Sequence, residues 1–170
     1  MPRRLGMIIL LASAGFLAAC GATMEERVQE GIDDTRAAFE AEPENANETA
    51  DRTEFYLPGE YTVEDPSDEN NIIVTEGGDS FVLFVNPNEA PDSQLFYELQ
   101  QPLAEEWIAN ETFQENERFG FVTVREVAED RFEIVASAGG VKMTTLSEES
   151  DVADNMEWMM KTVRSVDTGN

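Results

Sequence analysis

Residues 71–146 consist of short apolar runs of strand length separated by turn signals, and this pattern constrains the fold more than any other feature. Residues 71–75 and 80–85 are two such runs, and Gly77-Gly78-Asp79 between them predicts a tight turn. Glu129-Asp130 and Gly139-Gly140 are the turn signals of a second group. That group contains four strand-like runs, at residues 107–113, 119–127, 131–136 and 141–146. Strands joined by such short turns pair antiparallel, so the sequence predicts a hairpin followed by a meander.

Two of these runs indicate how the sheet is covered. Residues 81–85 are all apolar, which is typical of a central strand buried on both faces. In residues 131–136 the apolar side chains of Phe132, Ile134 and Ala136 alternate with the other positions. Successive side chains of a strand point to opposite faces, so one face of this strand is predicted to be more buried than the other.

The last element is the clearest helix of the sequence. Its apolar residues recur at spacings of four and three, which places them on one stripe that can pack on the sheet: Val152, Met156, Met159, Val163 and Val166. Ser150 and Asp151 are suitable N-terminal caps. A shorter helix is predicted at residues 95–99, with Asp92 or Ser93 as its cap and Pro102 as its limit.

Four residues on these two helices are candidates for contact with a partner. Trp158 and Met160 lie off the apolar stripe of the last helix, so they are predicted to form an exposed contact patch. Phe96 and Tyr97 on the shorter helix are the second pair. Methionine adapts to varied binding surfaces, but the methionines on the stripe itself are explained by packing on the sheet.

The segment before the sheet divides into a helix and a linker. Residues 21–40 predict a helix with a thin apolar stripe of Met24, Val28, Ile32 and Phe39. This helix is interpreted as a stalk or a partner-binding element, and loose packing on its own domain or partial disorder are the alternatives. Residues 41–53 are polar, acidic and free of aromatic side chains, as in a flexible linker. About 13 such residues span roughly 20 Å.

The first residues of the chain have the features of an export signal. Arg3 and Arg4 precede an apolar run, and Leu17-Ala18-Ala19-Cys20 follows it directly. The run has about 15 residues, whereas a membrane-spanning helix needs roughly 20. The motif resembles the lipobox of bacterial lipoproteins. That resemblance implies cleavage before Cys20 and attachment of lipid to its thiol. An ordinary secretory signal with an unrelated cysteine is the alternative.

Three parts are therefore expected. Residues 1–19 are a lipoprotein signal peptide, residues 20–53 a lipidated N-terminus with helical stalk and acidic linker, and residues 54–170 a single domain. The domain is predicted to be α+β, with an antiparallel sheet of about five to seven strands packed against the C-terminal helix and the shorter helix. The order of elements, a hairpin-rich sheet closed by a long helix, resembles the PsbP-like sandwich. Such a resemblance implies a fold and no function.

The charge of the chain excludes some partners. It has 11 basic residues, 36 acidic residues and no histidine, for a net charge of −25. Loss of residues 1–19 removes Arg3 and Arg4 but no acid, which leaves 9 basic and 36 acidic residues and a net charge of −27. This charge repels nucleic acid and anionic lipid. Salt screens the self-repulsion, so a salt-loving or alkaliphilic bacterial source is expected. An acidic surface protein of an ordinary bacterium is the alternative.

The missing residue types limit the chemistry. Without histidine, neither a Ser-His-Asp triad nor a histidine-ligated zinc site can form. Cys20 is the single cysteine, and the glycine-rich nucleotide-binding motifs are absent. No cofactor and no metal are therefore expected. Asp65, Asp68, Glu69 and Asn70 offer oxygen ligands for calcium, but they lack the spacing of a calcium loop and are explained by a solvated acidic turn.

Paired carboxylates are the remaining route to catalysis. Glu98 and Glu106 have apolar neighbours in the sequence, and Ser137 with Lys142 is a further pair. We expect instead a non-catalytic, membrane-anchored accessory or binding domain outside the cytoplasm, held through lipid on Cys20 and meeting a protein partner near the membrane. A carboxylate-based hydrolase of cell-wall or extracellular polymer is the alternative. A cation-dependent structural protein is the third interpretation.

Overall fold

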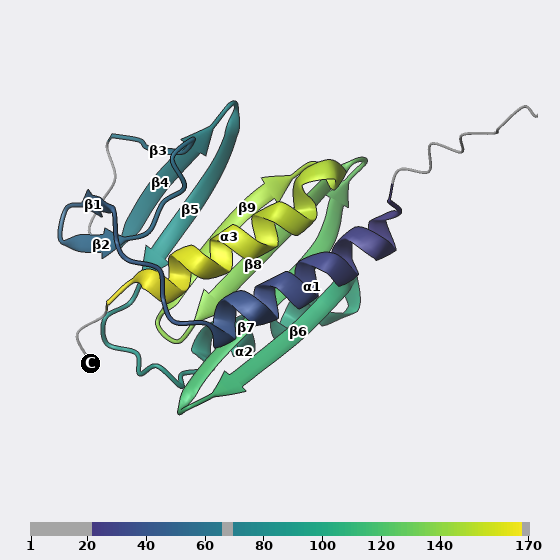
Figure 1. Cartoon of the computed structure of the whole chain (residues 1–170). Coiled ribbons are helices and arrows are strands. Elements are labelled where there is room, and N and C mark those ends of the chain that lie inside the picture. The colour runs from purple at the N-terminus through teal and green to yellow at the C-terminus, as the bar shows by residue number, and fades with distance from the viewer. Residues whose placement is uncertain (1–21, 66–69, 168–170) are drawn as a thin grey trace, which may run out of the picture.

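The computed structural model describes residues 22–65 and 70–167, and a seven-stranded antiparallel sheet forms the centre of the fold (Figure 1). The spatial order of its strands is β3-β4-β5-β9-β8-β7-β6. Their bounds are Thr62–Val63 (β3), Asn71–Glu76 (β4), Asp79–Val85 (β5), Trp107–Glu115 (β6), Arg118–Ala128 (β7), Arg131–Ala138 (β8) and Val141–Ser147 (β9). The predicted α+β class, the hairpin and the meander are confirmed.

The sheet is not a simple sequential meander, because β9 lies between β5 and β8. Phe81 of β5 and Ile134 of β8 both pair with Thr145 of β9, one on each side. The chain leaves β5 and passes through α2 (Leu95–Gln100) and a 3-10 helix (Gln101–Glu106) before it enters β6 at the far edge. The hairpin β4–β5 and the meander β6–β9 are thereby joined into one sheet.

Two helices cover one face of the sheet. α1 (Met24–Glu40) and α3 (Val152–Ser165) lie side by side over the sheet, roughly along the direction of its strands (Figure 1). They run parallel, because Arg27 near the start of α1 donates to the carbonyl of Ser150, while Arg164 near the end of α3 donates to the carbonyl of Phe39. The main core lies between these helices and the sheet. Its fully buried side chains include Phe39, Phe55, Phe81, Ile134, Met143, Met156 and Met159.

The opposite face is covered in part by α2. Phe96 of α2 is buried in a second apolar cluster with Phe119, Phe121 and Val135. The ring of Phe84 on β5 extends this cluster and meets Phe96 edge-on, with ring centroids 5.7 Å apart. The rest of this face is open, and Val82 of β5 is 39% exposed there. The prediction that residues 81–85 are buried on both faces is therefore wrong, since β5 alternates buried and accessible positions.

Residues 20–53 are predicted to lie outside the folded domain as stalk and linker, but residues 24–53 are part of it. Phe39 of α1 is fully buried, and Gly31 lies so close to α3 that only glycine fits there without a shift. A two-stranded sheet, β1 (Glu48–Ala50) with β2 (Thr53–Phe55), replaces the predicted linker. The side chain of Asn47 closes this segment by pairing with both backbone groups of Leu57.

The predictions that concern residues 1–21 lie outside the described residues, including lipid attachment at Cys20. Within the part that is described, no helix is both long enough and apolar enough to cross a membrane.

Candidate functional site

A groove of about 680 Å³ lies between the first half of α1 and the end of the sheet formed by β6, β7 and β8. Its floor is apolar. Met24, Val28 and Ile32 come from α1, Ile108 comes from β6, and Phe132 comes from β8. Ligand sites are typically concave, mostly apolar and of about 300–1,000 Å³, and this groove has those properties.

The floor of the groove follows from two local features. The three α1 residues are four positions apart, so their side chains stand above one another on one face of the helix. Thr23 and Glu26 form a capping box that begins the helix at Met24 and so places the first of these side chains. On β6 the register with β7 shifts between Trp107 and Ala109, and Ile108 at this irregularity is 47% exposed.

Carboxylates line the rim of the groove. They come from four different elements of the fold: Glu25, Glu126, Asp130 and Glu149. Arg27 offsets one of them, with its Nε atom 3.8 Å from Glu149. The groove is thus a negatively charged opening over an apolar floor. It can accept a segment that combines apolar side chains with flanking positive charges.

Trp158 and Met160 do not form the predicted exposed contact patch. Met160 is fully buried and Trp158 is only 7% exposed. The reason is that α3 is covered on more than one side, by β8 and β9 beneath it and by α1 beside it. The Trp158 ring also packs against Tyr61, with the ring centroids 4.3 Å apart. Positions off the sheet-facing stripe are therefore buried as well.

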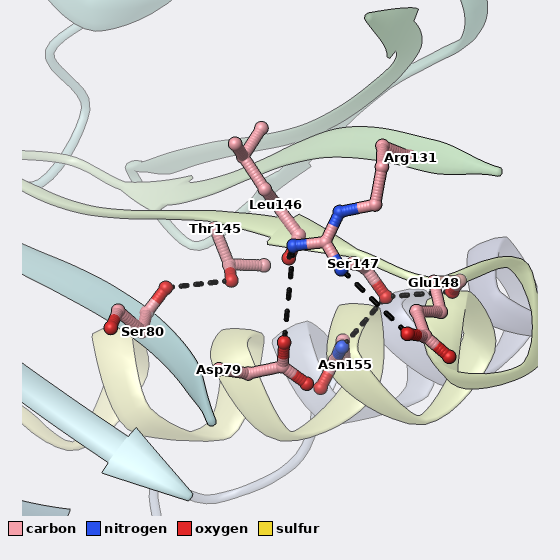
Figure 2. A network of polar contacts seen from close by, with 8 residues as sticks. All are labelled: Asp79, Ser80, Arg131, Thr145, Leu146, Ser147, Glu148 and Asn155. Atoms are coloured by element: carbon pink, nitrogen blue, oxygen red, sulfur yellow. Dashed lines mark hydrogen bonds and ion pairs between the residues drawn. The ribbon is translucent and has the colours of Figure 1, made fainter. Parts of the chain in front are cut away.

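A polar chain fixes the indole of Trp158. Its Nε1 donates to Oδ1 of Asn155 at 2.9 Å, and Nδ2 of Asn155 donates to Oγ of Ser147 at 2.9 Å. Figure 2 shows the Asn155–Ser147 contact at the junction of β9 and α3, where Arg131 also donates to the carbonyl of Leu146. The hydrogen bonds satisfy polar atoms that would otherwise be buried without partners. Trp158 is thus anchored within the fold.

Phe96 and Tyr97, the second predicted pair, also pack within the fold. Phe96 is 6% exposed, and Nζ of Lys142 lies 5.5 Å from the centroid of its ring. Tyr97 stacks on Trp107 at 6.1 Å between centroids, and its hydroxyl accepts a hydrogen bond from Asn110. Tyr97 is half-buried, so part of its surface is accessible to a partner.

Of the polar candidates for catalysis, only Ser137 and Lys142 lie next to each other among the described residues, as opposite residues of β8 and β9. Glu98 is exposed, and the side chain of Glu106 is 54% exposed and paired with Arg125 at 2.9 Å. Ser137 is buried and its hydroxyl donates to the carbonyl of Val141, while Lys142 lies over aromatic rings. Neither carboxylate has the buried surroundings that a catalytic acid requires.

Of the four residues considered as calcium ligands, Asp68 and Glu69 lie outside the described part of the chain. Among the residues that are described, no group of three or more acidic, histidine or cysteine side chains is placed to hold a metal ion.

No protein-family model and no curated protein matches the chain. Among solved structures, it is similar to the cyanobacterial PsbP protein CyanoP of Synechocystis sp. PCC 6803, with a TM-score of 0.42 and 8% sequence identity over 68% of this chain and 85% of that one. The order of elements in the sequence resembles the same PsbP-like sandwich. Similarity at this level carries no argument about function.

The groove was not predicted from the sequence, although part of its signal is present there. The apolar stripe that carries Met24, Val28 and Ile32 is visible in the sequence, but by itself it indicates only one side of a stalk. Ile108 and Phe132 complete the floor only when β6 and β8 reach the same end of the sheet. That proximity depends on contacts between residues distant in the sequence, which periodicity does not reveal.

Proposed function

We propose that this chain is a non-catalytic, extracytoplasmic lipoprotein of the bacterial cell membrane that binds a cationic amphipathic segment of a partner protein. The observation that carries the proposal is the groove at the N-terminal end of α1, with its apolar floor and four rim carboxylates. Amphipathic helices bind in such grooves through apolar anchors, and the surrounding charges select their partners.

The anchoring part of the proposal rests on the sequence. Leu17-Ala18-Ala19-Cys20 resembles a lipobox, and Cys20 lies four residues before Met24 at the end of the groove. Lipid on that cysteine would hold the groove near the membrane surface. The net charge of −27 after loss of residues 1–19 disfavours direct docking on anionic lipid. A protein segment with basic residues is the occupant that this charge favours.

The binding test uses the folded protein and a synthetic peptide that forms a helix with leucines on one face and lysines on the other. A peptide of the same composition in scrambled order is its control. Ile108→Gln removes an apolar anchor from the groove without changing charge. Leu146→Gln is the matched variant, since Leu146 is 46% exposed against 47% for Ile108 and lies outside the groove.

We expect Ile108→Gln to weaken binding of the amphipathic peptide about tenfold, measured by calorimetric titration, because it removes roughly 1.4 kcal/mol of apolar contact. Leu146→Gln should bind like the unchanged protein. Equal binding of the scrambled peptide would mean that charge alone attracts both peptides. That result would refute the proposal that the groove binds an amphipathic segment. In cells, the unchanged protein is expected to incorporate labelled palmitate, whereas Cys20→Ser is not; incorporation by neither protein would refute the anchor.

A further inference from the structure

A second, smaller pocket lies at the opposite end of the helix pair, where α3 ends beside the turn between β8 and β9. Its volume is about 180 Å³, which is below the range of drug-sized ligand sites. The apolar part of its wall comes from Pro91, Val141, Val163 and Val166. Two arginines, Arg118 and Arg164, line the same pocket. In a chain with 36 acidic residues, the convergence of two guanidinium groups on one hollow is unusual.

Arg164 is held in place by backbone groups. Its Nε atom donates to the carbonyl of Phe39 at 3.0 Å and its Nη2 atom donates to the carbonyl of Ala41 at 3.1 Å, so it satisfies carbonyls at the end of α1. The guanidinium also lies over the Phe39 ring, 5.4 Å from its centroid. Within the described residues it forms no ion pair. A guanidinium has five N–H donors, so further donors remain for a ligand.

Burial lowers the pKa of Arg164, and the neighbouring Arg118 guanidinium lowers it further. Arginine stays protonated in proteins, so the lowered value reflects a positive charge held at a cost beside another positive charge. Glu115 and Glu42 act in the opposite direction and offset part of this repulsion. An anion placed between the two guanidinium groups would relieve the remainder.

Arg118 also has donors to spare. Its Nη2 atom pairs with Glu115 at 3.1 Å, whereas its Nε atom is buried and has no hydrogen-bond partner. A buried N–H without a partner is destabilising, and a bound acceptor would remove that penalty. Arginine recognises carboxylates through two parallel N–H donors. The buried Nε of Arg118 and the remaining N–H donors of Arg164 therefore both favour a carboxylate as the ligand.

We infer that this pocket binds a small carboxylate with a short apolar tail. The guanidinium groups of Arg118 and Arg164 take the carboxylate, and the proline and valine walls take the tail. The same chemistry is carried by a free short-chain acid and by the C-terminal carboxylate of a peptide that ends in an apolar residue. Asp167 lines the pocket as well, and its negative charge would repel the carboxylate of the ligand.

The test measures the melting temperature of the folded protein with sodium butyrate, against sodium chloride at equal ionic strength. A ligand that binds only the folded state raises the melting temperature, and at ten times its Kd the rise should be a few degrees. Chloride corrects for charge screening, which alone stabilises so acidic a chain. No additional rise with butyrate would overturn the inference.

Variants assign the binding to the pocket. Arg118→Gln should abolish the butyrate-specific rise, whereas Arg125→Gln should keep it, because Arg125 pairs with Glu133 and Glu106 away from the pocket. Asp167→Asn should lower the Kd for butyrate several-fold by removing a negative charge from the lining of the pocket. Equal responses of Arg118→Gln and Arg125→Gln would overturn the assignment, as would weaker binding by Asp167→Asn.

A last pair of probes separates the two sources of carboxylate. A tripeptide that ends in valine with a free carboxylate is compared with the same peptide as its C-terminal amide. Binding of the free acid at lower concentration than butyrate, with no binding of the amide, identifies a peptide terminus as the ligand. Binding of butyrate alone identifies a free short-chain acid.

Discussion

Tyr61 lies between two aromatic rings at the β3 end of the sheet. Its ring meets that of Phe81 edge-on at 5.5 Å and that of Trp158 at 4.3 Å between centroids. Its hydroxyl is close to several carboxylates, of which Glu60 and Glu76 have the largest effect. Burial and, to a smaller extent, these negative charges together raise the pKa of Tyr61 to about 12, because both disfavour the tyrosinate.

The raised pKa predicts a loss of stability in strong alkali. Between the unfolded value of 10.0 and the folded value of about 12, the unfolded chain releases the Tyr61 proton while the folded protein keeps it. Proton release then favours unfolding, so the melting temperature should fall as the pH rises through this range. Tyr61→Phe keeps the ring packing and removes the proton. Its melting temperature should fall less over the same range, and an identical pH profile for both proteins would contradict the assignment.

At the scale of single elements, the contact between α1 and α3 depends on Gly31. A Cβ atom at this position would lie 2.6 Å from Sδ of Met156 and 3.1 Å from Cα of Ala153. The methionine side chain can move, but the backbone of α3 at Ala153 can move only if the two helices separate. The small residue is therefore what allows the parallel helices to pack closely.

We predict that Gly31→Ala lowers the free energy of unfolding by about 1–3 kcal/mol through overpacking. An isolated or exposed helix would show the opposite sign, because alanine stabilises a helix by about 1 kcal/mol relative to glycine. Urea denaturation measures the difference. Gly59→Ala is the matched control, since no atom lies within 4 Å of the added Cβ, and it should change stability little. A stabilising effect of Gly31→Ala would show that α1 is detached, as the stalk interpretation assumed.

The elements that could be predicted well from the sequence are those whose conformation is determined by residues close to one another in the chain. The turns at Gly77-Gly78 and Glu129-Asp130 and the strands around them depend on local backbone preference and on a period of two. Phe39 illustrates what the sequence did not show. It lies on a thin stripe of an acidic helix, yet it is fully buried against Phe113 and close to Gly120. Those partners lie more than 70 residues away, and no local pattern identifies them.

At the scale of the whole molecule, the main feature is the excess of negative charge and the repulsion that it causes. Many of the few basic side chains are used in ion pairs, including Arg36 with Glu111 and Arg131 with Glu148, and these pairs are accessible to solvent. Exposed ion pairs stabilise a fold little. They cannot offset the repulsion among 36 acidic residues. Screening by salt is therefore an expected requirement of the fold, in keeping with the proposed salt-loving source.

The corresponding prediction is that the melting temperature rises steeply as sodium chloride increases from 0.1 to 1 M. Over that range the Debye length falls from about 10 Å to about 3 Å, so repulsion between surface carboxylates is removed. Potassium chloride should give the same curve, since screening depends on ionic strength and not on the cation. A melting temperature that stays constant or falls would indicate a surface adapted to low salt. A response to micromolar calcium alone would favour the cation-dependent structural interpretation.

The inclusion of α1 in the domain shortens the tether that a lipid on Cys20 would provide. Met24 already belongs to the helix, so four residue steps separate it from Cys20, a reach of about 14 Å even when fully extended. A domain on so short a tether has little freedom to tilt or to move away from the surface of the bilayer. Its groove would encounter basic segments that project from the same membrane at high effective concentration, so recognition would become a search in two dimensions.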